Sequence, residues 1–187
     1  MEAAHDVLHF WFGAPGSVHY GKSRAEWFKK SAVFDALIRD RFLGLHEAAA
    51  AGRLVHWHDS PLTLLALIIV LDQFPRNLFR ESSKAFATDA PALAAARRMT
   101  SMQWDERLNV VERQFVYLPY EHAENVEVQR ESMRLFAALG NSNLLEWARK
   151  HAVIVERFGR FPHRNALLGR VSTPEEIEFL RQPGSAF

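Results

Sequence analysis

The chain has 187 residues, of which 48% are hydrophobic and 24% charged, enough for one well-buried core and too little for two. Its formal net charge of +1 gives no global field that would attract nucleic acid or an anionic membrane, and the absence of cysteine excludes disulfides, thiolate nucleophiles and zinc–thiolate sites. We therefore expect a single domain over residues 1–187 that binds neither nucleic acid nor a membrane.

The first residues, MEAAHDVLHFWFG, have neither the basic flank nor the small-residue cleavage site of a signal peptide. We therefore expect the protein to be cytoplasmic. Aromatic residues gather in this region, as Phe10-Trp11-Phe12 and, after a short loop from Gly13 to Gly21, as Trp27-Phe28. They are too dense for a simple surface, so we expect them in the core or in a lid over the helices.

Apolar residues recur at helical spacing along nearly the whole chain, and no stretch alternates long enough to predict a strand. The sequence therefore predicts an all-α fold. Ser31 can cap a helix that runs toward Gly52, and Ser60-Pro61 begins a helix that continues to about Phe74. This second helix is apolar on every face, and its apolar run of ten residues is half of the roughly 20 that span a bilayer. We expect it to be the buried central helix.

The helical pattern continues through the second half of the chain. We expect further helices over residues 88–102, 105–118, 120–139, 143–158 and 173–181. Gly140 is placed to stop the third of these. The sequence Thr173-Pro174-Glu175-Glu176 is a capping box with proline at the first helical position, and it begins the last one.

Three prolines, Pro75, Pro119 and Pro162, each follow Phe or Leu at the expected end of a helix, and they lie 44 and 43 residues apart. Spacings of this size are typical of stacked helix pairs, in which equivalent corners lie side by side along one edge. We therefore predict that the polar residues of the three corners converge. These residues are Asp72, Gln73, Arg76 and Asn77; Glu121, His122 and Glu124; His163, Arg164 and Asn165.

Asp72 falls in the last turn of the expected central helix, where the helix dipole disfavours a carboxylate by about 0.3–1 kcal/mol. It needs a cationic partner. One interpretation is a structural lock in which Arg76 or a C-terminal arginine ties the central helix to the end of the chain. The other is that Asp72 belongs to a functional site, because ion-pair networks and functional sites perturb charged groups in the same way.

His122 and Glu124 offer groups for general acid–base chemistry, and His151 supplies a second imidazole from the following helix. The spacing fits neither HExxH nor paired Glu-x-x-His motifs, so we predict no metal site. The alternative is structural, with His122 and His151 as a hydrogen-bonded pair between helices and Glu124 as a solvated residue in a first helical turn.

The segment GRFPHRNALLGR, residues 159–170, concentrates cationic side chains around a Phe-Pro break and contains no carboxylate. With the arginine just before it, the set comprises Arg157, Arg160, His163, Arg164 and Arg170. Guanidinium groups bind carboxylate and phosphate in bidentate geometry, and a short helix begun by Pro162 would add free N–H groups for an anion. The alternative is that these arginines neutralise the carboxylates of the neighbouring corners.

Four segments together resemble the bacterial domain of unknown function 924 family: LDQFPRNLFR (71–80), FATDAPAL (86–93), ERQFVYLPYEHAE (112–124) and RFGRFPHRNALLGRVSTPEE (157–176). WFKKSAVFDALIRDRF (27–42) resembles the early segment of the family, so the likeness covers nearly the whole chain. The resemblance implies stacked antiparallel helix pairs in a tetratricopeptide-like superhelix, and no established activity. Tyr120-Glu121 departs from the apolar and then small or polar pair that the family tends to carry, so Glu121 is left out of the candidate residues.

Three functions remain open. The first is a polar pocket that binds a small anionic ligand or an acidic peptide end. The second is a hydrolase or lyase that acts on a phosphorylated or carboxylated metabolite, with His122 or Glu124 as general base and Arg160 and Arg164 stabilising negative charge. The third is an interaction scaffold whose polar motifs are structural. The residues of the expected pocket are Asp72, Gln73, Arg76, Asn77, His122, Glu124, His151, Arg157, Arg160, His163, Arg164, Asn165 and Arg170.

Geometry separates these hypotheses. A cavity in which His122 and two arginines reach one point favours the first two, and a dry, fully paired network favours the third. The sequence does not identify a cofactor or the oligomeric state.

Overall fold

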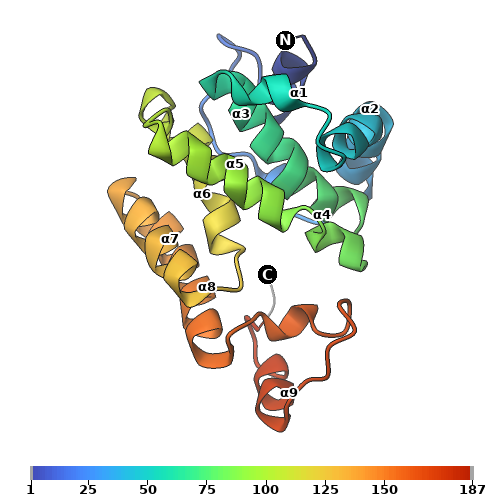
Figure 1. Ribbon diagram of the computed structural model, residues 1–187, viewed down its shortest axis with the longest axis vertical. Helices are drawn as coiled ribbons and strands as arrows, with labels where there is room; N and C mark the ends of the chain where they lie inside the picture. Colours follow the sequence, from blue (N-terminus) through green and yellow to red (C-terminus); the bar gives the residue numbers. More distant parts are fainter. Residues whose placement is uncertain (1, 186–187) are drawn as a thin grey trace.

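The computed structural model describes residues 2–185, and over that range every regular element is a helix (Figure 1). The α-helices are α1 (Glu2–Phe12), α2 (Ala32–Ala50), α3 (Pro61–Ile68), α4 (Phe74–Leu78), α5 (Asp89–Ser101), α6 (Val110–Glu121), α7 (Val126–Ala138), α8 (Ser142–Phe158) and α9 (Pro174–Leu180). A π turn, Ile69–Gln73, joins α3 to α4, and short 3₁₀ turns lie at Ala25–Trp27, Val55–His58, Ser83–Phe86, Asp105–Arg107 and Pro162–Arg164. The predicted all-α class is confirmed.

The stretch from α3 through the π turn to α4 is the buried central helix. Leu64 and Ile68 are 0% exposed and Leu67 and Leu71 are 3% exposed, so the helix is covered on every face from Leu64 onward, whereas Leu62 in its first turn is 45% exposed. By length and composition, Pro61–Leu78 could span a membrane, but 78% of it is buried inside the fold, as is usual for a core helix. The helix extends four residues beyond the predicted end at Phe74.

Helices pack around this centre on several sides. α1 and α5 contact α3, α2 contacts α4 and the π turn, and α6 lies against α3, α5 and α7. α7 and α8 form an antiparallel pair, and the C-terminal segment with α9 lies at the opposite end of the molecule from α1 (Figure 1). This arrangement is compatible with the stacked helix pairs of a tetratricopeptide-like protein.

The N-terminal aromatic residues are core residues of a helix, α1, that the sequence pattern did not single out. Trp11 and Phe12 are 0% and 1% exposed, and Trp11 lies against Trp27 with ring centroids 6.0 Å apart. Phe28 differs, because it is 61% exposed while stacking on Phe115 at 6.4 Å. The N-terminal aromatic groups therefore pack into the main hydrophobic core, and Phe28 lies at its edge.

Side-chain caps begin the helices where the sequence placed them. Ser31 accepts a hydrogen bond from the Phe34 amide and Ser60 from the Thr63 amide, each at 3.3 Å. Thr173 and Glu176 form the predicted capping box, which begins α9. Capping fixes helix starts because the first N–H groups have no partner inside the helix.

The predicted corner at Pro119 is wrong. Pro119 lies inside α6, which continues to Glu121, and the next helix begins at Val126 after the Asn125 side chain caps its first turn. Pro75 likewise lies within a continuous helix, whereas Pro162 begins a 3₁₀ turn. The three prolines are therefore not equivalent corners of a repeat.

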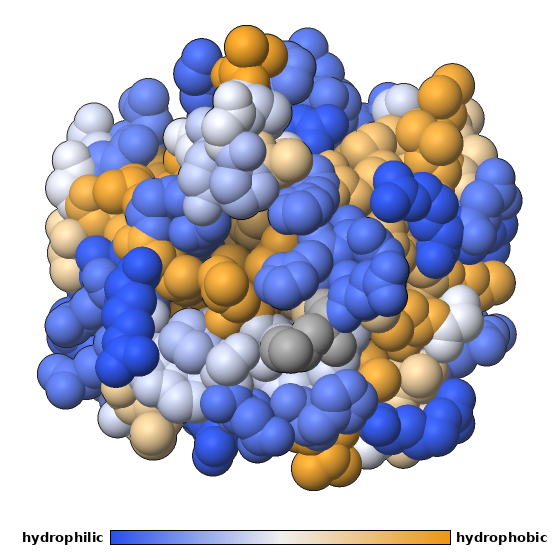
Figure 2. Space-filling view, turned by 90° about the horizontal axis from the view of Figure 1, so that it is seen from above, coloured by the Kyte–Doolittle hydropathy of each residue, from blue (hydrophilic) through white to orange (hydrophobic). Residues whose placement is uncertain are grey.

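Large exposed apolar side chains, such as Val18, Val55 and Val171, come from separate segments of the chain. Figure 2 shows the face at the top of Figure 1, where hydrophobic and hydrophilic residues are interspersed. Single apolar residues at a surface are normal and indicate no function by themselves.

Candidate functional site

The central helix continues past Pro75 because its backbone is paired in an unusual way. Proline has no N–H, so a regular helix would leave the carbonyl of Leu71 unpaired. Thr88 Oγ1–H donates to that carbonyl at 2.6 Å. The N–H of Phe74 donates to the carbonyl of Ile69, five residues back, and closes a π turn. A side chain from outside the helix thus replaces the hydrogen bond that proline cannot make.

The π turn also frees the carbonyl of Val70, which accepts a hydrogen bond from Nδ1 of the buried His46 at 3.0 Å. Isolated π turns inside α-helices are frequent at functional sites. This turn presents two buried polar residues, Asp72 and Gln73, and Gln73 Nε2 donates to Asp72 Oδ2 at 2.5 Å. No residue type marks a π turn in a sequence, so sequence reasoning missed it.

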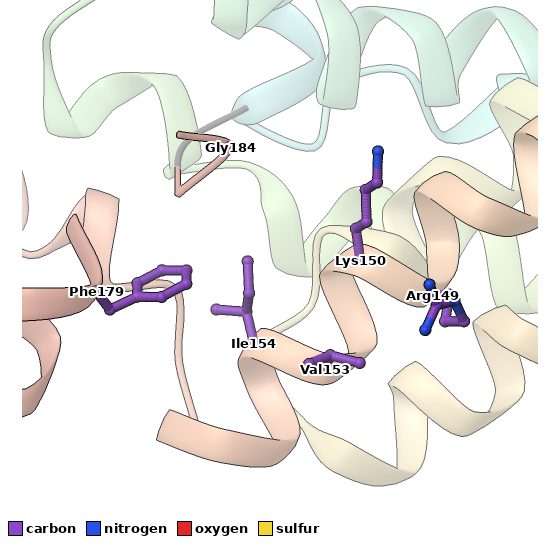
Figure 3. A pocket seen from close by; sticks show the side chains of 6 residues that line it. All are labelled: Arg149, Lys150, Val153, Ile154, Phe179 and Gly184. Carbon is purple, nitrogen blue, oxygen red and sulfur yellow. The ribbon is translucent and has the colours of Figure 1, made fainter. Parts of the chain in front are cut away.

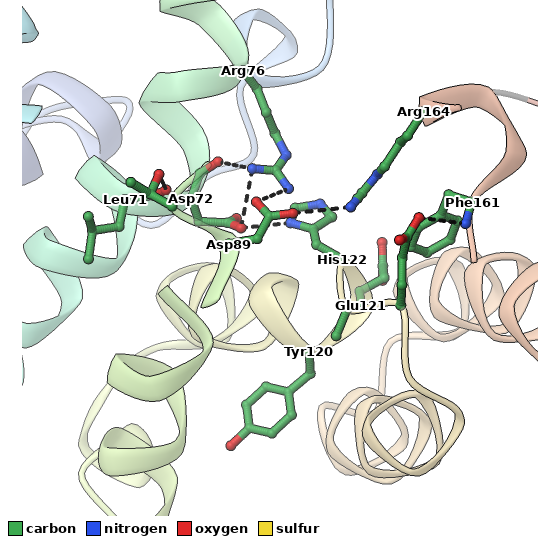
Figure 4. Close-up of polar contacts among 12 residues, drawn as sticks. Leu71, Asp72, Arg76, Asp89, Tyr120, Glu121, His122, Phe161 and Arg164 are labelled. Atoms are coloured by element: carbon green, nitrogen blue, oxygen red, sulfur yellow. Dashed lines mark hydrogen bonds and ion pairs between the residues drawn. The ribbon is translucent and has the colours of Figure 1, made fainter. Parts of the chain in front are cut away.

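Five charged or ionisable side chains meet beside this turn (Figure 4), and we call them the central polar cluster: Asp72, Arg76, Asp89, His122 and Arg164. His122 Nδ1 lies 2.8 Å from Asp72 Oδ1. Asp89 accepts from Arg76 Nη2 at 3.0 Å and from Arg164 Nη1 at 3.1 Å, so one carboxylate bridges two guanidinium groups. Arg76 also donates to the carbonyl of Asp72 and lies 3.5 Å from its carboxylate. The predicted convergence of Asp72, His122 and Arg164 is therefore present.

The charge states within the cluster follow from burial and from its ion pairs. Burial would raise the pKa of Asp72, but Arg76 and His122 outweigh it and lower the pKa to about 2. Burial, and then Arg76, lower the pKa of His122. At neutral pH Asp72 is therefore a carboxylate and His122 is a neutral imidazole. Because Nδ1–H donates to Asp72, Nε2 carries the free lone pair of the ring.

Arg164 lies in a largely buried position. Its guanidinium carbon lies 4.6 Å from the ring centroids of both Phe86 and Phe161. These cation–π contacts stabilise the positive charge of Arg164. Burial lowers the pKa of Arg164 to about 10, so it still carries its charge at neutral pH. Its buried Nε has no hydrogen-bond partner among residues 2–185.

Glu121 and His151 form a second buried pair beside the cluster. Glu121 is 4% exposed, and burial together with Asp72 raises its pKa to about 8. Burial lowers the pKa of His151 to about 3. His151 Nδ1 lies 3.2 Å from Glu121 Oε1 and 2.9 Å from the carbonyl of Trp147. The close contact is thus one between a neutral acid and a neutral imidazole rather than an ion pair.

The buried amide of Gln129 fixes the end of α6, which carries Glu121 and His122. Gln129 Nε2 donates to the carbonyl of Glu121 at 2.7 Å and to that of Ala123 at 2.8 Å. The Glu121 carbonyl is at the last residue of α6 and the Ala123 carbonyl lies just beyond it, so the helix itself supplies no partner for either. One side chain from α7 therefore positions both neighbouring acid–base residues.

Glu124 braces the C-terminal loop. Its carboxylate accepts from Arg170 at 2.5 and 2.9 Å and from the Phe161 amide at 2.8 Å. Burial would raise the pKa of Glu124, but Arg170 and the Phe161 amide lower it. Arg170 Nε also donates to Asn165 Oδ1 at 3.0 Å. These contacts give Glu124, Arg170 and Asn165 a structural part in holding the segment that carries Arg164.

Two of the predicted arginines contact α9 and not the cluster. Arg160 binds Glu176 with two hydrogen bonds, at 2.7 and 2.8 Å, and Arg157 lies 2.8 Å from Glu175. Arg160, aided by the Thr173 amide, lowers the pKa of Glu176 to about 2. Arg157 and Arg160 therefore anchor α9 to the end of α8.

Asn77 and His163 make contacts of their own. Asn77 Nδ2 donates to Asp35 at 2.8 Å, and the same carboxylate pairs with Arg80, so these residues join α4 to α2. His163 lies with its ring 5.7 Å from that of Phe161, and burial lowers its pKa to about 4.

A pocket of about 220 Å³ lies away from these residues, lined by Arg149, Lys150, Val153, Ile154, Phe179 and Gly184 (Figure 3). The central polar cluster is packed rather than hollow, as the scaffold hypothesis expects, but it is neither dry nor fully paired. The side chains of Arg76, Asp89 and His122 are 22%, 21% and 13% exposed, and Arg164 Nε has no hydrogen-bond partner among residues 2–185. In the part of the chain that the structure describes, no group of three His, Asp or Glu residues is arranged to hold a metal ion.

Comparisons with known proteins agree with this fold. The profile of the family described as bacterial protein of unknown function (DUF924) matches residues 7–184. A solved structure of a protein of unknown function from Agrobacterium tumefaciens is 39% identical in sequence and superposes with a TM-score of 0.88. The alignment covers 97% of this chain and 98% of the Agrobacterium chain. No curated protein matches the chain. Because the profile extends over nearly the whole sequence, the chain belongs to the bacterial DUF924 family of unknown function.

Proposed function

We propose that the central polar cluster binds a small carboxylate or phosphate ligand, or the acidic end of a peptide. The observation that carries the proposal is that Arg76 and Arg164, from distant segments, converge on the single carboxylate of Asp89. Two guanidinium groups around one oxyanion are a common way to recognise carboxylate and phosphate. Asp89 therefore occupies the position that a ligand oxyanion would take.

Because the charges of the cluster already balance, a bound anion must replace one of its carboxylates rather than add to them. Arg76 and Arg164 are matched by Asp72 and Asp89, while His122 is neutral, so the cluster has no spare positive charge at neutral pH. Asp72 is fully buried, whereas the Asp89 side chain is 21% exposed at the first turn of α5. A ligand from solvent would displace Asp89 and pair with both arginines.

The test is the shift in melting temperature that inorganic phosphate and malonate produce. At ten times the Kd we expect the wild type to gain about 3–6 °C. Asp89→Asn should melt lower without ligand, because two arginines lose their carboxylate, and should gain more with ligand. Arg164→Gln should lose the ligand shift, and Arg157→Gln, which removes an exposed ion pair between α8 and α9, should keep it.

Equal melting curves with and without ligand, in the wild type and in Asp89→Asn, would contradict anion binding. If Asp89→Asn and Arg164→Gln are also strongly destabilising and their effects are coupled, the cluster is a structural lock, as the scaffold hypothesis expects.

A second candidate function rests on the Asp72–His122 pair. A buried carboxylate that accepts from Nδ1–H orients an imidazole and leaves Nε2 as a general base. This favours His122 over Glu124 as the base of a hydrolase or lyase, because Glu124 is occupied by Arg170. Turnover of a phosphate monoester or hydroxy-acid panel that disappears in His122→Ala and persists in Glu124→Gln would support it, and equal loss in both variants would not.

The proposed location stays the cytoplasm, where phosphorylated and carboxylated metabolites are available. The proposed partners include neither nucleic acid nor membrane, because the formal net charge is only +1.

A further inference from the structure

Glu121 presents a buried oxygen that has no hydrogen-bond partner among the described residues. Its Oε1 lies 3.2 Å from His151 Nδ1, and its Oε2 is buried without a hydrogen-bond partner among residues 2–185. In Figure 4 the Glu121 side chain lies beside His122 and points toward the side of the cluster on which Arg164 lies. Buried polar atoms without a partner are rare and costly, so each one needs an explanation.

The neighbouring contacts locate the proton of this acid. His151 Nδ1 faces two acceptors, Glu121 Oε1 and the carbonyl of Trp147 at 2.9 Å, so Nδ1 carries the ring hydrogen. A proton on Glu121 Oε1 would face the hydrogen of this ring nitrogen, 3.2 Å away, so Oε1 is the unprotonated oxygen. When Glu121 is neutral, its proton is on Oε2, which then is a donor without an acceptor.

We propose that Glu121 is a specificity-determining residue of the anion site, and that its neutral carboxyl donates one hydrogen bond from Oε2 to an oxygen of the bound ligand. The inference rests on the proposed function and narrows it. The ligand must bring an oxyanion to two arginines and also offer an oxygen that accepts from a carboxylic acid. Carboxylate and phosphate oxygens do both.

The groups that face Glu121 define how its state depends on pH. Asp72 from the central helix repels a second negative charge, and His151 from α8 is neutral and offers none to offset it. His122, the next residue in the chain, is neutral at any pH above its lowered pKa. Arg164 keeps its charge until the pH approaches its pKa of about 10. Between pH 7 and 9 Glu121 is thus the group of this set that changes charge, since its pKa is about 8.

The proposal predicts a pH profile for binding. Malonate stays fully ionised between pH 7 and 9, so it adds no titration of its own. With binding confined to the protonated form, the wild-type affinity for malonate should be about tenfold weaker at pH 9 than at pH 7. Glu121→Gln should bind malonate equally at both pH values, because the amide N–H donates without titrating. Glu121→Leu should bind more weakly at pH 7, because it removes the donor.

Isothermal titration of these variants, with Glu131→Gln as control, tests the proposal. Glu131 is a partly exposed carboxylate on α7 paired with Arg134, so its removal should leave the wild-type profile unchanged. A wild type whose affinity is the same at pH 7 and 9, or a Glu121→Gln variant with the wild-type slope, overturns the role of Glu121 while leaving anion binding intact. If neither the wild type nor Asp89→Asn binds malonate at pH 7, both the role of Glu121 and anion binding by the cluster are overturned.

Infrared spectroscopy gives a readout that needs no ligand. The free wild type at neutral pH should show the carbonyl band of a protonated carboxyl group, and the band should be absent from Glu121→Gln and present in Glu131→Gln. Its absence from the wild type would overturn the proposal.

Discussion

Replacing Asp72 by Asn should destabilise the protein strongly, because it removes the negative charge on which the cluster depends. Asp72 is 0% exposed and contacts Arg76, His122 and Gln73. Asn has nearly the same size, so the change leaves packing intact and isolates the charge. His122 would lose its carboxylate acceptor, and Arg76 would lose one of its two ion pairs.

The magnitude follows from two independent arguments. Lowering the pKa of Asp72 from 3.8 to about 2 corresponds to roughly 2 kcal/mol of preference for the charged form at neutral pH. Removing one member of a buried pair costs about 3–5 kcal/mol. We therefore expect Asp72→Asn to lower the free energy of unfolding by about 3 kcal/mol at pH 7.

Urea unfolding at pH 7 and at low pH measures this effect. Because the folded-state pKa of Asp72 lies below its ordinary value of 3.8, its stabilisation is present above pH 4 and is lost as the pH falls toward 2. The difference between wild type and Asp72→Asn should therefore shrink in acid. Glu127→Gln removes an exposed ion pair with Arg130 and should change stability by less than about 0.5 kcal/mol. An Asp72→Asn variant as stable as Glu127→Gln at pH 7 would refute the reasoning.

Three other changes have defined outcomes. Because the pKa of Glu121 is raised in the folded state, its contribution to stability is complete below pH 4.5 and is lost as the pH rises to about 8. In urea titrations, the free energy of unfolding of the wild type relative to Glu121→Gln should therefore fall by about 1.4 kcal/mol per pH unit over this range. A difference that does not change with pH would contradict a buried neutral acid. Thr88→Val leaves the Leu71 carbonyl unpaired and should cost about 1–3 kcal/mol in the same assay, and a neutral effect would show that this carbonyl needs no partner. Arg160→Ala should lower the melting temperature by breaking its contacts with Glu176 while leaving the phosphate shift intact, and loss of that shift would place Arg160 in the site.

The helical class and most helix starts were predictable from the sequence because they depend on local chemistry. Ser60 and Thr173 cap helices with hydrogen bonds to residues three positions on, and Gly52 and Gly140 take the left-handed backbone, at φ of 70° and 67°, that ends helices. These signals lie within a few residues of the feature that they fix.

The errors at the prolines have a different origin. Pro75 stays within a helix because Thr88, a residue from outside that helix, supplies the missing hydrogen bond. Pro119 is followed by two further residues of α6, whose last turn Gln129 caps from the next helix. Partners that are distant in sequence decide both cases, and a local rule about proline cannot include them.

Only part of the candidate site was predicted, because several of its contacts also join residues that are distant in sequence. His122 and Arg164 were identifiable by residue type and do lie together with Asp72. Asp89 was missed because an acidic residue in a first helical turn has an ordinary explanation. Glu121 was expected at a corner but was left out of the site because Tyr120-Glu121 departs from the family pattern, and its burial is a property of the folded chain. Arg157 and Arg160 were grouped with Arg164 by proximity in sequence, although α9 supplies their partners.

The most direct test of the central claim is a crystal structure of Asp89→Asn grown with phosphate. Our account predicts a tetrahedral anion between the guanidinium groups of Arg76 and Arg164, with one oxygen toward Glu121. Water alone between these arginines, or phosphate bound only elsewhere, such as beside Arg149 and Lys150, would contradict it.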